Sequence, residues 1–276
     1  MAPDRQSFRE LPPDRRLARV ISCTWVQQVA GDAATYIHRA VAHASVELIW
    51  RAGSPPALRG PRTGPLIEVL APGTTQVGVR FRPAAGQVLG MPASELADLT
   101  VECEAVWGST AGLEERLAAA PRWEAALGVL QELVVARLGP GSPLDPLVES
   151  AVERMPWHAG DVSALTSSLH ISERQFRRRC QDAVGLPPKM LHRVQRFQGF
   201  LALAQVALAQ RRPAGEEGLA RLAAELGYAD QAHLTRESRR LSGLAPRAFL
   251  DDLEHRCGGD HEHAISLAPL LGARRL

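Results

Sequence analysis

The sequence predicts an α+β protein, in which a small β-barrel or sandwich with helices precedes an all-α domain of two helix-turn-helix units joined by a long helix. Short apolar runs broken by Gly and Pro fill residues 19–90, as is typical of small barrels and sandwiches. Helical periodicity and a doubled helix-turn-helix pattern follow. We therefore expect domains at 1–143 and 144–253, and a flexible tail at 254–276.

The first domain is expected to begin with an arm over residues 1–18, because this stretch is rich in Pro and Arg. Turn residues gather at Arg51–Pro56 and Arg59–Pro65, which we expect to be loops. The apolar runs between such breaks predict strands at Arg19–Val29, Thr35–Ala42, Val46–Trp50, Leu66–Leu70, Gln76–Phe81 and Gln87–Leu89.

After these strands the spacing of the apolar residues changes to the period of a helix. Helices are expected at Leu113–Ala119 and Pro121–Leu138, and the run Gly139–Pro143 should end the first domain. A further helix over Leu144–Met155 would open the second domain. The helix at Pro121–Leu138 carries one apolar stripe, which must bury against the domain's own sheet or against a second subunit; it consists of Trp123, Leu127, Leu130 and Val134.

One helix-turn-helix pattern occurs twice near the C-terminus, at Leu165–Pro188 and at Leu222–Pro246. Residues of the second helix recur 58 positions later, whereas those of the first helix recur 57 positions later, so the second turn is one residue longer. Between the copies, Lys189–Gln210 predicts one long connecting helix. Two such units on one chain offer two reading helices to the major groove of DNA.

The ends of both reading helices carry local signals. Ser172 with Gln175 three residues later predicts a capping box for a helix over Glu173–Val184, and Asp230 is expected to cap the second reading helix. A glycine stands where each helix should end, and prolines follow; these glycines are Gly185 and Gly243.

The second copy contains Gly227-Tyr-Ala-Asp-Gln-Ala-His-Leu-Thr-Arg236 followed by Gly243-Leu-Ala-Pro246. These strings resemble the signature of AraC/XylS-type transcription regulators, over roughly residues 155–253. The resemblance implies binding to promoter DNA, with RNA polymerase as a partner of an activator and a homodimer as one assembly state. The first domain is similar to the sensor-like domain of one AraC subgroup, at His43–Trp50, Gly78–Pro83, Leu89–Leu96 and Val106–Gly108. That subgroup usually has Pro-Asp-Gly where this chain has His43-Ala44-Ser45.

Helical spacing divides each reading helix into an inward and an outward face. Phe176 and Cys180 point inward on the first helix, as do Leu234, Ser238 and Leu241 on the second. Cys180 and Ser238 stand where the family usually has a large apolar residue. Cysteine is a small hydrophobe that fits a core, whereas Ser238 loses apolar area, so we expect either a softer second unit or neighbours that fill the space. The candidate DNA-contacting residues are Arg174, Arg177, Arg178 and Gln181, then Gln231, Thr235, Arg236 and Arg239. The alternatives are a solvated helix face and, for Arg178 and Arg236, phosphate anchors or braces of the fold.

Charge is distributed unevenly. Residues 160–250 hold 14 basic and 8 acidic side chains, whereas residues 1–159 hold 15 and 17. A basic module joined to a slightly acidic one is typical of a DNA-binding domain fused to another domain. The start of the chain has no apolar core of a signal peptide, and no apolar run reaches the length of a membrane span. We therefore expect a cytoplasmic protein whose scattered cysteines are reduced thiols.

No nucleophile motif, P-loop or dinucleotide fingerprint occurs, so we expect neither an enzyme nor a cofactor. His38 and His43 do not complete the metal set of a cupin-like barrel and are expected to be ordinary strand histidines. The tail groups three imidazoles and a thiol, for which disorder is the main expectation and zinc the alternative; they are His255, Cys257, His261 and His263.

The first domain is expected to bind a small effector. Aromatic side chains fall in or beside its predicted strands, and they are the candidate effector-binding walls unless they only pack the core: Trp25, Trp50, Phe81 and Trp107. The signal would pass through Gly139–Pro143 to the DNA-binding domain. The alternatives are a cupin-like metal-dependent enzyme domain fused to a DNA-binding module, and a first domain used only for self-association.

Overall fold

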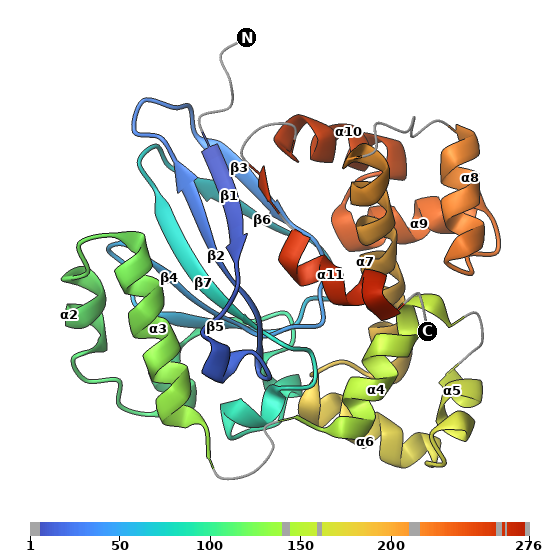
Figure 1. Ribbon diagram of the computed structural model, residues 1–276, viewed down its shortest axis with the longest axis horizontal. Coiled ribbons are helices and arrows are strands. Elements are labelled where there is room, and N and C mark those ends of the chain that lie inside the picture. The colour runs from blue at the N-terminus through green and yellow to red at the C-terminus, as the bar shows by residue number, and fades with distance from the viewer. Residues whose placement is uncertain are drawn as a thin grey trace.

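A β-rich half and a helical half lie side by side in the computed structural model, and they meet at the helix α11 (Ala264–Ala273) (Figure 1). The structure describes residues 6–139, 144–158, 162–209, 216–257, 261–262 and 264–273, without the side chains of 208–209, 216–217, 253–257, 261–262, 264 and 273. The predicted order, a β region followed by a helical domain, is confirmed. Within these ranges no helix is both long and apolar enough to cross a bilayer.

One sheet of seven strands has the order β8-β5-β4-β7-β2-β1-β9, and its neighbouring strands are antiparallel except for the parallel pair β1 and β9. A separate antiparallel pair joins β3 to β6. The strands are β1 (Gln6–Leu11), β2 (Ile21–Val29), β3 (Tyr36–Ala40), β4 (Glu47–Arg51), β5 (Ala57–Arg59), β6 (Leu66–Leu70), β7 (Thr75–Phe81), β8 (Thr100–Glu102) and β9 (His261–Glu262).

Two expectations for this half are wrong. The arm predicted over residues 1–18 contains β1, which pairs with β2 along its whole length. Sequence reasoning missed β1 because its inward face includes the charged Glu10, which Arg80 neutralises. The strand predicted at Gln87–Leu89 is instead the 3-10 turn η2 (Gly86–Leu89), whose apolar residues are buried beside α6 rather than in a sheet.

Three helices follow β8, namely α1 (Cys103–Trp107), α2 (Leu113–Ala118) and α3 (Trp123–Arg137). The helices α2 and α3 confirm those predicted at Leu113–Ala119 and Pro121–Leu138, apart from the residues at their ends. The apolar stripe of α3 faces β7, with Leu127, Leu130 and Val134 buried and Trp123 half-buried. The stripe therefore buries against the chain's own sheet, and in Figure 1 α3 covers one face of that sheet.

The helical half contains both helix-turn-helix units. Unit 1 consists of α5 (Val162–Ser168) and α6 (Glu173–Ala183), and unit 2 consists of α8 (Glu216–Glu225) and α9 (Gln231–Ser242). The predicted long connecting helix is α7 (Pro188–Ala209), whose Phe197 and Phe200 are fully buried and stacked. The remaining elements are α4 (Pro146–Arg154), the 3-10 turn η4 (Met155–Trp157) and α10 (Pro246–Cys257).

The tail also differs from its prediction. Residues 254–276 were expected to be flexible, yet Ala264–Ala273 forms α11 and packs on α7, α4, β1 and β2. The side chain of Leu267 on α11 is buried. Residues 264–273 carry no charged side chain, and an apolar face is supplied by Ile265, Leu267, Leu270 and Leu271. The prediction of a flexible tail did not take this apolar face into account.

Candidate DNA interface and the cavity between the two halves

The two reading helices begin as their sequences predict. The Ser172 hydroxyl accepts from the Gln175 backbone N–H, and the Gln175 side chain accepts from the Ser172 backbone N–H, so the capping box is complete. In unit 2 the Asp230 carboxylate accepts from the His233 backbone N–H at 2.5 Å. Both predicted terminal glycines have positive φ, 85° for Gly185 and 80° for Gly243, which L side chains rarely adopt.

The inward faces are also confirmed. Phe176 and Cys180 in unit 1 and Leu234, Ser238 and Leu241 in unit 2 are fully buried. Burial raises the pKa of the Cys180 thiol to about 12, so this group packs as a small apolar side chain. The Ser238 hydroxyl donates to the Leu244 carbonyl at 2.8 Å, which compensates for the apolar area that serine lacks.

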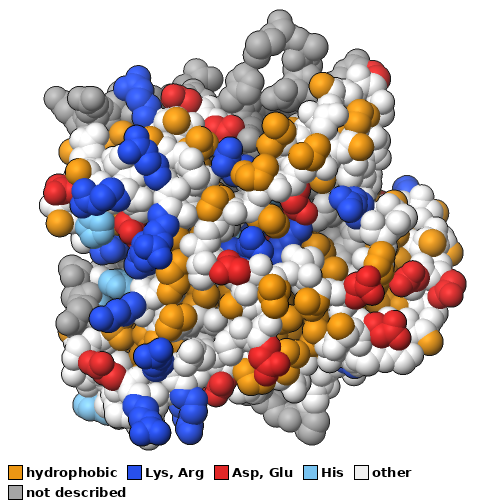
Figure 2. Space-filling view, turned by 180° about the vertical axis from the view of Figure 1, so that it is seen from behind, with side chains coloured by type: hydrophobic (Ala, Val, Ile, Leu, Met, Phe, Trp, Pro, Cys, Tyr) orange, Lys and Arg blue, Asp and Glu red, His pale blue; other side chains and the backbone are white. Residues whose placement is uncertain are grey.

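The outward faces present the predicted DNA-contacting residues to solvent. All five arginines among them are exposed, whereas Gln181, Gln231 and Thr235 are half-buried. Within the part of the chain that the structure describes, none of the five forms an ion pair; they are Arg174, Arg177, Arg178, Arg236 and Arg239. Figure 2 shows Lys and Arg side chains gathered along the edge of the molecule that the helical half forms. This edge has the charge of a phosphate-binding surface.

Three neighbouring arginines are instead committed to the fold. Arg193 on α7 makes two bonds to the Glu237 carboxylate on α9, at 2.7 and 2.6 Å. Burial alone would raise the pKa of Glu237, but these bonds hold it below its usual range. Arg196 donates to the Gly227 carbonyl and lies over the Tyr228 ring at 4.4 Å. In unit 1, Arg179 pairs with Asp145, the N-cap of α4.

The β-rich half contacts the C-terminal ends of both reading helices. At the end of α9, the Ala42 backbone N–H donates to the Leu241 carbonyl at 2.9 Å, and Arg39 on β3 donates to the Ser242 carbonyl at 3.2 Å. At the end of α6 the contact is close backbone packing. A Cβ on Gly86 would lie 2.4 Å from the Ala183 carbonyl oxygen, so only glycine fits there.

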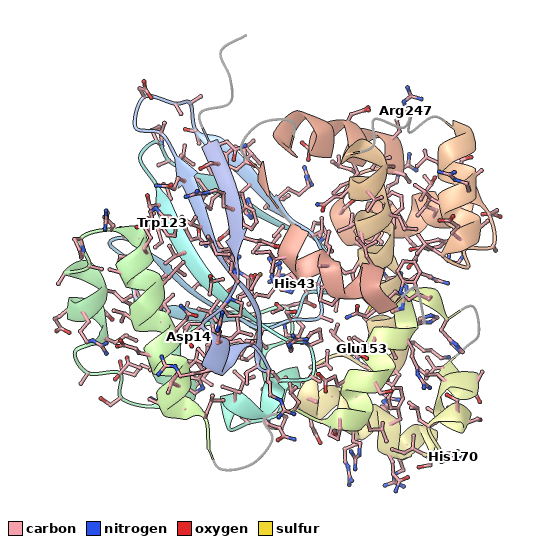
Figure 3. All side chains as sticks on the ribbon, viewed as in Figure 1. Asp14, His43, Trp123, Glu153, His170 and Arg247 are labelled. Atoms are coloured by element: carbon pink, nitrogen blue, oxygen red, sulfur yellow. The ribbon has the colours of Figure 1, made fainter. Side chains whose placement is uncertain are left out.

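A cavity of about 150 Å³ lies between the sheet and the helices α7, α10 and α11, and a second one of about 120 Å³ lies beside it. Both cavities reach the same four residues, which come from the β3–β4 loop, β7, α7 and α11: His43, Arg80, Gln198 and Ser266. In Figure 3 the labelled His43 lies at this junction of the two halves. The apolar wall of the larger cavity includes Phe8, Trp25, Leu201, Phe249 and Leu267.

The polar wall of the larger cavity includes Glu47, Arg59 and Arg80, which belong to a network of buried charges that extends to Glu10 and Glu68. Arg80 bridges Glu10 at 3.0 Å and Glu47 at 2.9 Å, while Arg59 pairs with Glu68 at 2.7 Å. Burial would raise the pKa of Glu47, but Arg80, His43 and Arg59 hold it at about 2. Burial lowers the pKa of His43 to about 4, although Glu47 opposes this shift. At neutral pH the wall therefore presents a neutral imidazole beside fixed ion pairs.

The predicted effector-binding residues are only partly brought together. Trp25 lines the larger cavity, whereas Phe81 lies in the core, Trp50 is half-buried on β4, and Trp107 lies beneath the Arg137 guanidinium at 5.5 Å. Sequence reasoning missed this charged network, because Glu10, Glu47, Arg59 and Arg80 are far apart in the sequence and each resembles an ordinary surface residue. His43 lies in the loop after β3, not in a strand as expected.

The described residues contain no group of three His, Cys, Asp or Glu side chains placed to hold a metal ion. This finding does not cover the candidate zinc ligands of the tail. The side chains of His255, Cys257 and His261 and the whole of His263 lie outside the described part of the chain.

Two separate parts of the chain match known domain families. Residues 165–252 match a helix-turn-helix domain family, and residues 9–102 match a domain of unknown function, DUF6597. A search of curated proteins found no match. The chain is similar to the solved structure of ToxT from Vibrio cholerae O395, with 13% identity, a TM-score of 0.42, and coverage of 89% of this chain and 97% of ToxT. ToxT bound to (E)-4-(8-methylnaphthalen-1-yl)but-3-enoic acid is similar with 12% identity, a TM-score of 0.43, and coverage of 90% and 99%.

Proposed function

We propose that the chain is a DNA-binding transcription regulator of the AraC type and that a small molecule controls its binding to promoter DNA; the match of residues 165–252 to a helix-turn-helix domain family supports the DNA-binding role. In this proposal residues 1–143 form the sensor domain and residues 144–253 the DNA-binding domain. The regulator acts in the cytoplasm, performs no catalysis, and contacts RNA polymerase where it activates; self-association through the sensor domain belongs to the same proposal.

The DNA interface rests on one observation above all: two capped reading helices carry five exposed arginines that form no ion pair with any residue the structure describes. Arg174 and Arg177 lie in the first half of α6, where a reading helix meets base edges, and arginine can bond guanine at two atoms. Gln231, Thr235 and Arg236 occupy the same part of α9. Arg178, Gln181 and Arg239 complete the interface, with phosphates as their partners.

The test is a comparison of two arginine variants of the full chain on specific and random duplex DNA. Arg174→Ala should weaken specific binding by about 1–3 kcal/mol and relax base preference at one or two positions. Arg179→Ala is the matched control, because its side chain is already paired with Asp145. If Arg174→Ala weakens specific and random DNA equally, it does not read bases.

Effector control is supported by the placement of the cavity. The sheet supplies one wall and the helices α7 and α10 of the DNA-binding domain supply another, so a ligand there contacts both halves. Arg39 lines the cavity and also bonds the end of α9. We therefore move the expected signal route from Gly139–Pro143, of which residues 140–143 lie outside the described part, to the β3–α9 contact.

A ligand changes DNA affinity only by as much as it distinguishes the two states. A tenfold change needs about 1.4 kcal/mol of coupling, and DNA must then change ligand affinity by the same factor. A thermal-shift screen of small amphipathic compounds, followed by DNA titrations with each hit, tests this control. Hits that stabilise the protein but leave DNA affinity unchanged would contradict it, and Arg39→Ala should uncouple hits that do act.

A further inference from the structure

The C-terminal helix α11 stands inside the region that a ligand would occupy. Ser266 and Leu267 line the larger cavity, and Ser266, Pro269 and Leu270 line the smaller one. Because both cavities also share His43, Arg80 and Gln198, α11 divides one hollow into two parts. Each part is smaller than the roughly 300–1,000 Å³ that is usual for a small-molecule site.

The bonds that hold α11 are of the kind a ligand makes. Glu10, whose carboxylate is fully buried, accepts from the Ser266 backbone N–H at 2.7 Å and from the Ser266 hydroxyl at 2.7 Å. Hydrogen bonds to a buried carboxylate are stronger than those between neutral groups. On the side of the DNA-binding domain, the Trp157 indole N–H donates to the Leu270 carbonyl at 3.1 Å. The helix therefore joins the sheet to the helical half.

The helix is also poorly suited to exist on its own. It has ten residues, fewer than an isolated helix needs in water, and Pro269 interrupts it. A proline inside a helix is strongly unfavourable, because it lacks the backbone N–H of one helical hydrogen bond and its ring crowds the preceding turn. Its helical form thus depends on docking, and its release would exchange the apolar contacts of Leu267 for water.

We propose that α11 is an internal ligand of the effector cavity, which the effector displaces. The inference rests on the proposed effector control and deepens it by naming the competitor and the ligand class. An effector that replaces α11 must supply two hydrogen-bond donors to Glu10 and an apolar body in place of Leu267. The class is therefore a small apolar molecule that bears hydroxyl groups or a protonated amine.

The test uses a chain ending at residue 257 and a labelled peptide of residues 261–276 as the probe. The peptide should bind the shortened chain and fail to bind the full chain, whose own α11 occupies the site. Replacing the serine of the peptide, Ser266→Ala, should weaken binding about tenfold, because it removes a donor to a buried carboxylate. Absence of binding to a folded shortened chain, or binding that ignores this replacement, would overturn the proposal.

Two variants of the full chain cover the case in which the shortened chain does not fold. Leu267→Glu places a charge against the apolar wall and should release α11, so amide exchange over 264–273 should accelerate. Ala268→Glu adds the same charge on the exposed side of the same helix and should leave exchange unchanged. Equal exchange in the two variants would overturn the proposal. DNA titrations of the same two variants separate effector control from the assignment of α11 as an internal ligand. If Leu267→Glu releases α11 and DNA affinity does not change, effector control is refuted, whereas the assignment of α11 as the ligand of the cavity stands.

Discussion

Unit 1 and unit 2 share a backbone plan but are held in place by different interactions. Unit 1 relies on apolar packing, with Cys180 in its core and close backbone contact at Gly86. Unit 2 relies on directed bonds, from Arg193 to Glu237, from Ser238 to the Leu244 carbonyl, and from β3 to the end of α9. Directed bonds form and break as discrete events, so the proposed effector is expected to act on the position of unit 2.

The largest effect should come from breaking the brace of unit 2. Arg193→Ala leaves the Glu237 carboxylate, 12% exposed, without its partner, and should cost about 2–4 kcal/mol of unfolding free energy. Arg179→Ala removes a pair from unit 1 whose arginine is 43% exposed and whose carboxylate, Asp145, keeps the backbone N–H groups of Leu147 and Val148 as donors, so it should cost at most about 1 kcal/mol. Chemical denaturation of the two variants measures the difference, and equal losses would contradict the contrast between the units.

The same variants have distinct consequences for DNA. Because Arg193 lies on α7 and positions α9, Arg193→Ala should reduce contacts of unit 2 while leaving base preference of unit 1 intact. The ion pair assigns Arg193 to the fold, since a guanidinium with two bonds to one carboxylate is not free for a phosphate.

The features that could be predicted from the sequence are local ones. The caps, the inward faces and the one-residue difference between the turns were all predicted, because each depends on neighbours within a few positions. The Arg193–Glu237 pair joins residues 44 positions apart, and the Glu10–Ser266 bonds join residues 256 apart. Pairs of this kind carry no periodic signal, so β1, the charged cavity wall and the docked tail were missed.

A smaller effect is expected from the hydroxyl that replaces a large apolar side chain. Ser238→Ala removes a buried donor to the Leu244 carbonyl and should cost about 1–2 kcal/mol. Ser167→Ala in unit 1 removes a similar bond, to the Ser163 carbonyl, but from an exposed side chain, and should be nearly neutral. Thermal unfolding of the two variants measures how much stability each one loses. A neutral Ser238→Ala would restore the expectation that unit 2 is soft at this position.

The smallest effect concerns the turns themselves. Each turn needs one residue with positive φ, and unit 2 uses Gly227 at 67° whereas unit 1 uses His170 at 53°. A side chain in this region costs about 1–2 kcal/mol, and glycine recovers only part of this because it also makes the unfolded chain more flexible. His170→Gly should therefore stabilise the protein by about 0.5 kcal/mol, and Gly227→Ala should destabilise it by about 1 kcal/mol. Denaturant midpoints of the two variants measure these changes. Loss of stability in His170→Gly would mean that the imidazole itself holds the turn of unit 1, and the contrast between packed and bonded units would then end at this position.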